Sequence, residues 1–185
     1  MIFKQDQNYW AVFYANEEAL IVQTCSGLGL TAIDHLYPPH ILPLDTTQLA
    51  DSFYDLHLYP PHILPLDTDN GTLGTTVLQA LANSRTLDNE AERIDFLKQE
   101  SFKPRYEDWV ANLCGNLGYK TRRALFKNVM SGDIWLHNGC LKISPSRHVK
   151  LEAWDAIDAD DVILSLDNSP EEIGAGLRLA LSRCR

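Results

Sequence analysis

An apolar run, a polar turn and a helix-like stretch recur in this chain at a fixed distance. Residues 63–85 (ILPLDTDNGTLGTTVLQALANSR) align without gaps with residues 163–185 (ILSLDNSPEEIGAGLRLALSRCR), 100 positions later. Identical residues in the two segments are Ile63, Leu64, Leu66, Asp67, Gly74, Ala80, Leu81 and Arg85 with their later counterparts. Strand–cap–helix units share composition by necessity, so the alignment leaves true duplication open. In either case it predicts two halves, each made of several strands followed by one helix.

Other segments supply further strands. NYWAVFYA (8–15) and EALIVQTC (18–25) are rich in β-branched and aromatic residues. DIWLH (133–137) and CLKIS (140–144) flank Asn138-Gly139, a pair that tolerates the positive φ angles of a tight hairpin turn. With 45% hydrophobic residues, a chain of 185 residues supports one sizeable core. We therefore predict one α+β domain spanning residues 1–185, with a mixed or antiparallel sheet and helices packed on it.

Three helices are predicted from capping signals and apolar spacing. Asp69 or Asn70 caps a helix that runs to Arg85, and Ser169 caps the last helix, with Pro170 first and Glu172 completing a capping box. A middle helix lies within residues 88–119. The residues predicted to face the core are Leu73, Val77, Leu78 and Leu81 in the first helix, Tyr106, Trp109, Val110, Leu113, Cys114 and Leu117 in the middle one, and Ile173, Leu177, Ala180, Leu181 and Cys184 in the last.

The segment TRRALFKN (121–128) alternates in polarity and predicts a strand. Basic residues gather around it, namely Lys103, Arg105, Lys120, Arg122, Arg123 and Lys127. They could form a stripe that binds nucleic acid, which makes a nucleic-acid-binding module the alternative function. A strand would instead place Arg122 and Arg123 on opposite faces, so a solvated rim is favoured.

The twelve residues HLYPPHILPLDT occur twice, at 35–46 and again at 57–68. Complete identity indicates a 22-residue tandem duplication, which covers residues 35–56 or, equivalently, 47–68. The two copies compete for one strand position. We expect the second copy to take it, because that copy alone leads into the helix at 73–85. The first copy would then be a surface excursion, with a short helix at 47–54.

Few groups of residues in the sequence could bind a metal or carry out catalysis. Four of the six histidines belong to the copied segment, and no cysteine or carboxylate stands at zinc-ligand spacing beside them, so we expect neither a metal nor a cofactor. Cys25, Cys114, Cys140 and Cys184 lack a CxxC or nucleophile motif, so a hydrolase has little support. Free thiols, no signal-peptide pattern and no apolar run of about 20 residues favour a soluble cytoplasmic protein that does not engage membranes.

Acidic residues outnumber basic ones by 25 to 16, which gives a net charge of −9 and a pI near 5.0. This balance disfavours nucleic acid as a partner and favours a basic protein. The densest acidic segment, DAIDADD, contains Asp155, Asp158, Asp160 and Asp161 and lacks the register of a calcium loop. It is either a solvated loop or a patch that binds a basic partner, and we name these four residues as candidate partner-binding residues.

Three C-terminal runs resemble those of contact-dependent growth inhibition (CDI) immunity proteins. They are YKTRRALFKN (119–128), ISPSRHVKLEAW (143–154) and DDVILSLDNSPEEIGAGLRLALSRC (160–184). The N-terminal hairpin and the ILPLD strand that enters a helix agree with the layout of that family, whereas the 22-residue copy departs from it. The shared motifs are structural residues and nominate no binding surface.

The resemblance implies a cytoplasmic, non-enzymatic protein that binds and neutralises the C-terminal toxin domain of a CDI effector. The toxins of this family are often nucleases, which grip phosphates and are usually basic. An acidic inhibitor complements such a toxin, in agreement with the charge argument made from composition alone.

Overall fold

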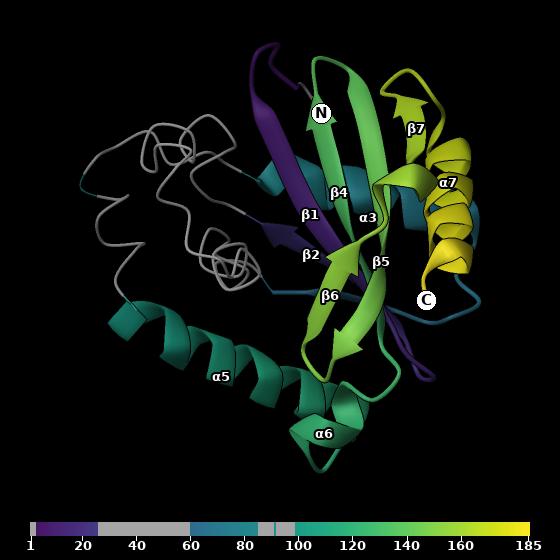
Figure 1. Ribbon diagram of the computed structural model, residues 1–185. Helices are drawn as coiled ribbons and strands as arrows, with labels where there is room; N and C mark the ends of the chain where they lie inside the picture. Colours follow the sequence, from purple (N-terminus) through teal and green to yellow (C-terminus); the bar gives the residue numbers. More distant parts are fainter. Residues whose placement is uncertain (1–2, 26–59, 85–90, 92–98) are drawn as a thin grey trace.

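A computed structural model describes residues 3–25, 60–84, 91 and 99–185 (Figure 1). Seven strands form one antiparallel sheet in the order β3-β2-β1-β4-β5-β6, with β7 also paired to β5. The strands are β1 (Asn8–Ala15), β2 (Leu20–Cys25), β3 (His62–Leu64), β4 (Met130–His137), β5 (Cys140–Lys150), β6 (Ala153–Ala156) and β7 (Val162–Ser165). The predicted single α+β domain is confirmed, and the sheet is antiparallel in all its pairings.

The predicted hairpin at Asn138-Gly139 joins β4 to β5. Asn138 has a φ of 50° and Gly139 a φ of 76°, as a tight turn of this kind requires. The register beyond the turn places Leu136 opposite Leu141 and Ile134 opposite Ile143, and all four side chains are buried.

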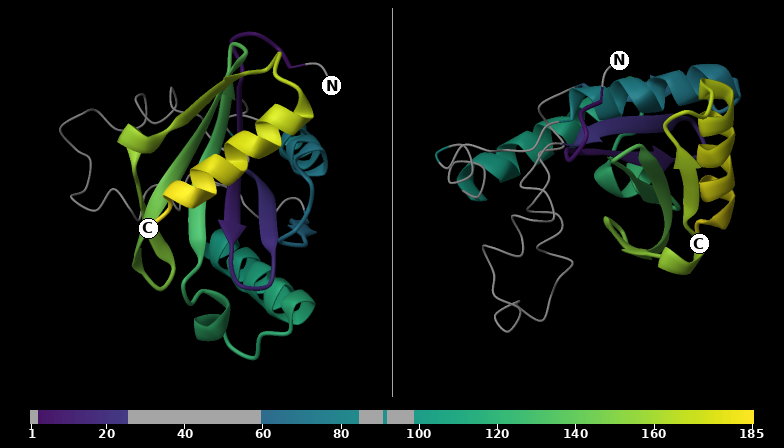
Figure 2. Two further views of the ribbon diagram at one scale, coloured as in Figure 1. Left: turned by 90° about the vertical axis from the view of Figure 1, so that its right-hand side faces the viewer. Right: turned by 90° about the horizontal axis from the view of Figure 1, so that it is seen from above.

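Helices α3 (Asn70–Asn83) and α7 (Pro170–Arg183) cover one face of the sheet (Figure 2). Asp69 caps α3 by accepting from the backbone N–H of Thr72, and Ser169 and Glu172 form the predicted capping box of α7. Both predicted core faces are confirmed, because Leu73, Val77, Leu81, Ile173, Leu177, Ala180 and Leu181 are buried and Leu78 and Cys184 pack against them.

The opposite face of the sheet is covered by α5 (Gln99–Leu117) and α6 (Arg122–Leu125). The predicted stripe of α5 is confirmed, since Trp109, Val110 and Leu113 are buried against the sheet. The prediction of a strand at 121–128 is wrong. Thr121 caps a short helix there, and its side chain accepts from the N–H of Ala124 at 3.1 Å. A side-chain cap of this kind satisfies a free backbone donor and outweighs the alternating pattern.

The two predicted halves are present, and their strands pair in equivalent registers. A shift of 121 positions carries the β1–β2 hairpin onto β4–β5, and a shift of 100 carries β3 and α3 onto β7 and α7. Leu20 lies opposite Leu64 in the first half, and their counterparts Leu141 and Leu164 lie opposite each other in the second. The two halves meet where β1 pairs antiparallel with β4, so they are related by an approximate two-fold axis through that pairing.

The same relation governs the contact between α3 and α7. A Cβ atom added to Gly74 would lie 1.8 Å from the carbonyl oxygen of Pro170, and one added to Gly174 would lie 2.0 Å from that of Asn70. Asn70 and Pro170 are themselves 100 positions apart. Each helix therefore meets the backbone of the other through the same glycine, a closeness that a side chain would prevent.

Of the two copies of HLYPPHILPLDT, the second supplies β3 and leads into α3, as predicted. The first copy, the suggested helix at 47–54 and most of residues 88–98 lie outside the described residues. Within the described ranges, every helix is too short or too polar to cross a bilayer.

Candidate functional site

The candidate acidic residues lie along one edge of the sheet. The C-terminal part of β5 pairs with β6, and its N-terminal part pairs with β7, so β6 and β7 follow each other along the same side of β5. The 3-10 turn η1 (Asp158–Asp160) connects them. Just before it, the N–H of Ile157 donates to the carbonyl oxygen of Pro145 at 2.9 Å. The acidic segment is thus an interrupted edge strand anchored to β5.

Three of the four candidate carboxylates make ion pairs within the chain. Asp155 lies 3.4 Å from Arg147, Asp160 lies 2.8 Å from Arg185, and Asp161 lies 3.2 Å from Lys142. Asp158 is exposed and makes no ion pair with any residue that the structure describes. The structure brings all four to one edge but compensates most of their charge, so the patch is less negative than its sequence indicates.

The C-terminus contributes to the same edge. The guanidinium of Arg183 donates to the carbonyl oxygens of Asp160 and Asp161, at 2.7 and 3.3 Å. The backbone of Arg185 exchanges hydrogen bonds with β5, donating to Ser146 and accepting from His148. The Arg183 contacts hold the backbone at the end of η1, and the exposed Asp158 begins that turn.

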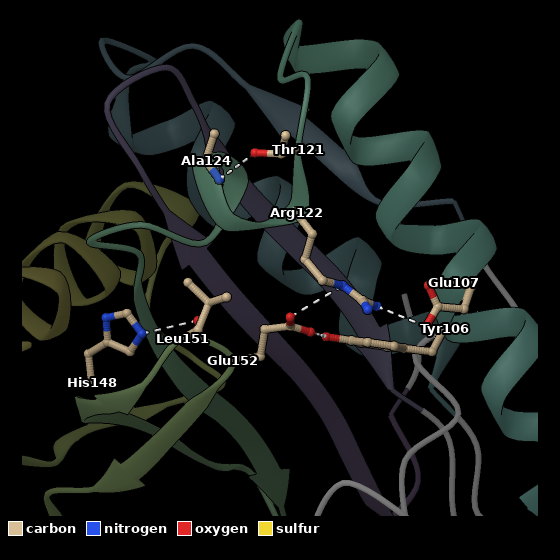
Figure 3. A network of polar contacts seen from close by, with 8 residues as sticks. All are labelled: Tyr106, Glu107, Thr121, Arg122, Ala124, His148, Leu151 and Glu152. Carbon is tan, nitrogen blue, oxygen red and sulfur yellow. Dashed lines mark hydrogen bonds and ion pairs between the residues drawn. The ribbon is translucent and has the colours of Figure 1, made fainter.

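A second polar cluster joins the β5–β6 turn to α5 and α6 (Figure 3). Arg122 Nε lies 3.2 Å from Glu152 Oε1, and Arg122 Nη2 lies 3.2 Å from Glu107 Oε1. The Tyr106 hydroxyl donates to Glu152 Oε2 at 2.5 Å, and the Arg122 guanidinium lies 5.2 Å from the centre of the Tyr106 ring. Three separate segments of the chain therefore meet at one cation.

The charges of this cluster favour the ionised form of Arg122. Partial desolvation lowers its pKa, but attraction by Glu152 and Glu107 outweighs that effect, and the pKa lies above its ordinary value. The arrangement is well suited to holding the β5–β6 turn in place, because a guanidinium can engage two carboxylates and an aromatic face together.

Trp154 fixes the other side of the same turn. Its indole N–H donates to the carbonyl oxygen of Val129 at 2.9 Å, and its ring lies against Tyr14 and Phe126. The His148 ring stacks on Trp154 with centroids 5.1 Å apart, and its Nε2 lies 3.2 Å from the carbonyl oxygen of Leu151. The turn is therefore held by contacts on both of its sides.

Groups that could carry other chemistry are dispersed. Among the described residues, no three His, Cys, Asp or Glu side chains gather as they would around a metal ion. All four cysteines are free thiols, and burial raises the pKa of both Cys114 and Cys184. Burial lowers the pKa of His62 in β3, which favours its neutral form. His35, His40 and His57 lie outside the described residues.

The basic residues near α6 do not act as one stripe. Arg122 is engaged by two carboxylates, while Lys120, Arg123 and Lys127 stand on and around a one-turn helix rather than along a strand. The side chains of Lys103 and Arg105 lie outside the described part of α5. No contact in the described residues favours nucleic acid over a solvated rim.

Sequence reasoning did not find the cluster at Arg122. Its members come from α5, α6 and the β5–β6 turn, and no linear spacing relates Tyr106, Arg122 and Glu152. The only signal in the sequence is that Arg122 belongs to the run YKTRRALFKN, and Glu152 and Trp154 to the run ISPSRHVKLEAW, both of which resemble the CDI immunity family.

The sequence profile of the family described as CDI immunity protein matches residues 51–184, which is more than half of the chain. The chain belongs to the CDI immunity protein family. The immunity protein CdiI-YPIII of Yersinia pseudotuberculosis is 37% identical to it over 191 aligned residues, which cover 95% of each chain.

Two solved structures resemble this immunity protein. A protein of unknown function from Neisseria meningitidis is 69% identical, with a TM-score of 0.84 and full coverage of both chains. A chain of the CdiA-CT/CdiI toxin and immunity complex from Yersinia pseudotuberculosis is 33% identical, with a TM-score of 0.75, and the match covers 98% of this chain and all of the other.

Both features described above lie inside the part of this immunity protein that the family profile matches. The acidic edge and the residues around Arg122 fall within residues 51–184, whereas β1 and β2 precede it. The profile match therefore includes the C-terminal part of β5, β6 and η1.

Proposed function

We propose that this immunity protein binds and neutralises the C-terminal toxin domain of a CDI effector in the cytoplasm of the producing cell. The observation that carries the proposal is the similarity to a chain of a toxin and immunity complex over nearly its whole length. A shared fold at this level of identity supports a shared kind of partner.

We further propose that the toxin is a basic nuclease and that inhibition needs no catalysis by the immunity protein. The net charge of −9 would accelerate association with a cationic surface and would disfavour most other partners. An inhibitor that covers a nuclease site or its substrate path acts by occupancy alone. Slow dissociation then keeps the toxin inactive.

The acidic edge at Asp155, Asp158, Asp160 and Asp161 is the proposed partner-binding surface. Asp158 offers a carboxylate without an internal ion pair, and the pairs formed by Asp155 and Asp160 are partly exposed. Exposed ion pairs contribute about 0–1 kcal/mol, so a basic residue of the toxin can displace Arg147 or Arg185 at little cost.

The test is to produce the toxin domain encoded beside this gene and measure its binding to the purified immunity protein by titration calorimetry. Tight binding with a one-to-one ratio, loss of nuclease activity in the complex and rescue of growth on co-expression are expected. If the wild-type protein neither binds the toxin nor rescues growth, the proposed function is wrong.

The acidic edge is tested separately by changing Asp155, Asp158, Asp160 and Asp161 to lysine. The matched control changes four exposed carboxylates of the paired halves, Glu17, Glu18, Asp67 and Glu171, which alters the net charge equally. We expect weaker binding for the first set than for the control. Equal affinity for both sets would remove the acidic edge from the interface and leave the function standing.

A further inference from the structure

The second half of the sheet carries a hairpin, the β5–β6 arm, which we define as residues 146–156. β5 has 11 residues, and the first-half positions equivalent to the arm lie almost entirely outside the described residues. The pairing of β5 with β4 ends at Pro145. From Ser146 onward, β5 pairs with β6, which follows β7 along the other side of β5. The arm therefore extends past the last residue that β4 pairs (Figure 1).

The tip of the arm exposes two apolar side chains. Val149 is 41% and Leu151 is 40% exposed, although both are large hydrophobic residues. The register of β5 against β6 shifts between His148 and Lys150, so Val149 is an extra residue in the strand. A bulge of this kind bends the strand and turns its side chains toward a new direction.

The arm is fixed in this position before any partner arrives. Glu152 is bound by Arg122 and Tyr106 on one side (Figure 3). On the other side, the His148 ring stacks on Trp154. Leu151 lies between these contacts, with its carbonyl oxygen near His148 Nε2. Exposed apolar groups held in one conformation lose little entropy on binding, which is the usual design of an interface anchor.

We infer that Val149 and Leu151 are the apolar anchor by which this protein binds its cognate toxin domain, an inference that rests on the proposed function. The charge around the arm indicates which partner binds there. The arm continues directly into the acidic edge, where Asp158 makes no ion pair with the described residues. A partner that covers both must therefore present basic residues to the acidic edge and, beside them, an apolar recess to Val149 and Leu151. A second copy carries the same charge of −9 and is repelled.

The experiment compares Leu151→Asp and Val149→Asp with Leu179→Asp. Leu179 lies on α7 and is 45% exposed, so its substitution matches the chemistry away from the arm. The affinity of each full-length variant for the toxin domain is measured by titration calorimetry. We expect either arm variant to weaken binding by at least about thirtyfold and the α7 variant to leave it within about threefold.

Thermal unfolding of each variant shows whether the arm has stayed folded, and Leu151→Ser provides a milder change for the same measurement. Wild-type affinity in both Leu151 variants and in Val149→Asp would overturn the anchor and leave the proposed function intact. Sedimentation tests whether a second copy of the chain binds the arm instead. A dimer that Leu151→Asp abolishes, with toxin affinity unchanged, would also overturn the anchor. If the wild-type protein itself fails to bind the toxin, the proposed function fails first.

Discussion

The first and second halves of the sheet share their strand registers and their helix contact, and among the described residues only the second carries an arm. In both, a hairpin, a short outer strand and a capped helix bury equivalent residues, such as Leu73 in one and Ile173 in the other. The second half adds the C-terminal part of β5, β6 and η1. The paired halves thus form the core, and the addition supplies exposed groups that the core does not need.

This difference separates stability from recognition. Substitutions at the contact between α3 and α7 should affect unfolding and spare the intrinsic affinity for the toxin. Substitutions at the tip of the arm should weaken the affinity for the toxin and leave unfolding nearly unchanged.

Gly74→Ala and Gly174→Ala should destabilise the protein strongly and to a similar degree. In each case the new methyl group meets a backbone carbonyl of the facing helix, which cannot move without shifting the helix. Overpacking of this kind costs roughly 2–4 kcal/mol, or a fall in Tm of about 5–15 °C for a chain of this size. Calorimetric unfolding measures both variants.

Gly115→Ala is the matched control. Gly115 lies in α5, where a Cβ atom would meet nothing within 4 Å, and alanine is the better helix former. We expect this variant to be more stable by up to about 1 kcal/mol. If Gly74→Ala and Gly115→Ala behaved alike, or if only one of the paired glycines mattered, the equivalence of the halves would be wrong.

Acid should weaken the starts of α3 and α7 together. Hydrogen bonds from Thr72 lower the pKa of Asp69, and those from Ser169 and Asn168 lower the pKa of Glu172. A lowered folded pKa means that the contribution is present above the ordinary values of 3.8 and 4.5 and is lost as the pH falls through the folded values. Asp69→Asn and Glu172→Gln should each flatten the fall in Tm between about pH 5 and pH 2.

Asparagine retains a side-chain oxygen that can cap α3, so Asp69→Asn removes the titration without removing the cap. An undiminished acid slope in both variants would show that other groups govern acid unfolding. A reduced slope in only one of them would indicate that the helix starts of the two halves are not equivalent.

Most of this shared framework was predictable from the sequence because its signals are local. The cap at Ser169 and the turn at Asn138-Gly139 each define the backbone conformation of a few consecutive residues. The 100-residue alignment relates two such local strand–cap–helix patterns to each other. The segment after Thr121 was predicted wrongly, because an alternating pattern and a one-turn capped helix look alike over eight residues. The residue that distinguishes the helix from a strand is Thr121, whose side chain accepts from the Ala124 N–H.

The candidate site was less predictable, because its partners come from distant segments. The sequence shows four aspartates close together but not that Arg147, Arg185 and Lys142 reach them from β5 and the C-terminus. It likewise gives no sign that Arg122 meets Glu152. Only tertiary structure brings such residues together, and the exposure of Leu151 depends on the same packing.

Deleting residues 35–56 should have the smallest effect on stability. The deletion removes one copy of HLYPPHILPLDT and leaves the sequence of β3 and α3 unchanged. A shorter connection between β2 and β3 changes the closure entropy by only about 1 kcal/mol or less. Unfolding and toxin binding close to those of the full chain are expected. A large loss of either would show that the extra copy contributes to the fold or to the interface.

The central claim is that the second half recognises the toxin through its arm while the paired halves only support it. Hydrogen exchange of backbone amides, measured with and without the toxin domain, tests this directly. Slower exchange on binding is expected in residues 146–161, with β1, β2 and α3 unchanged. Slower exchange in the first half, with residues 146–161 unaffected, would contradict the account.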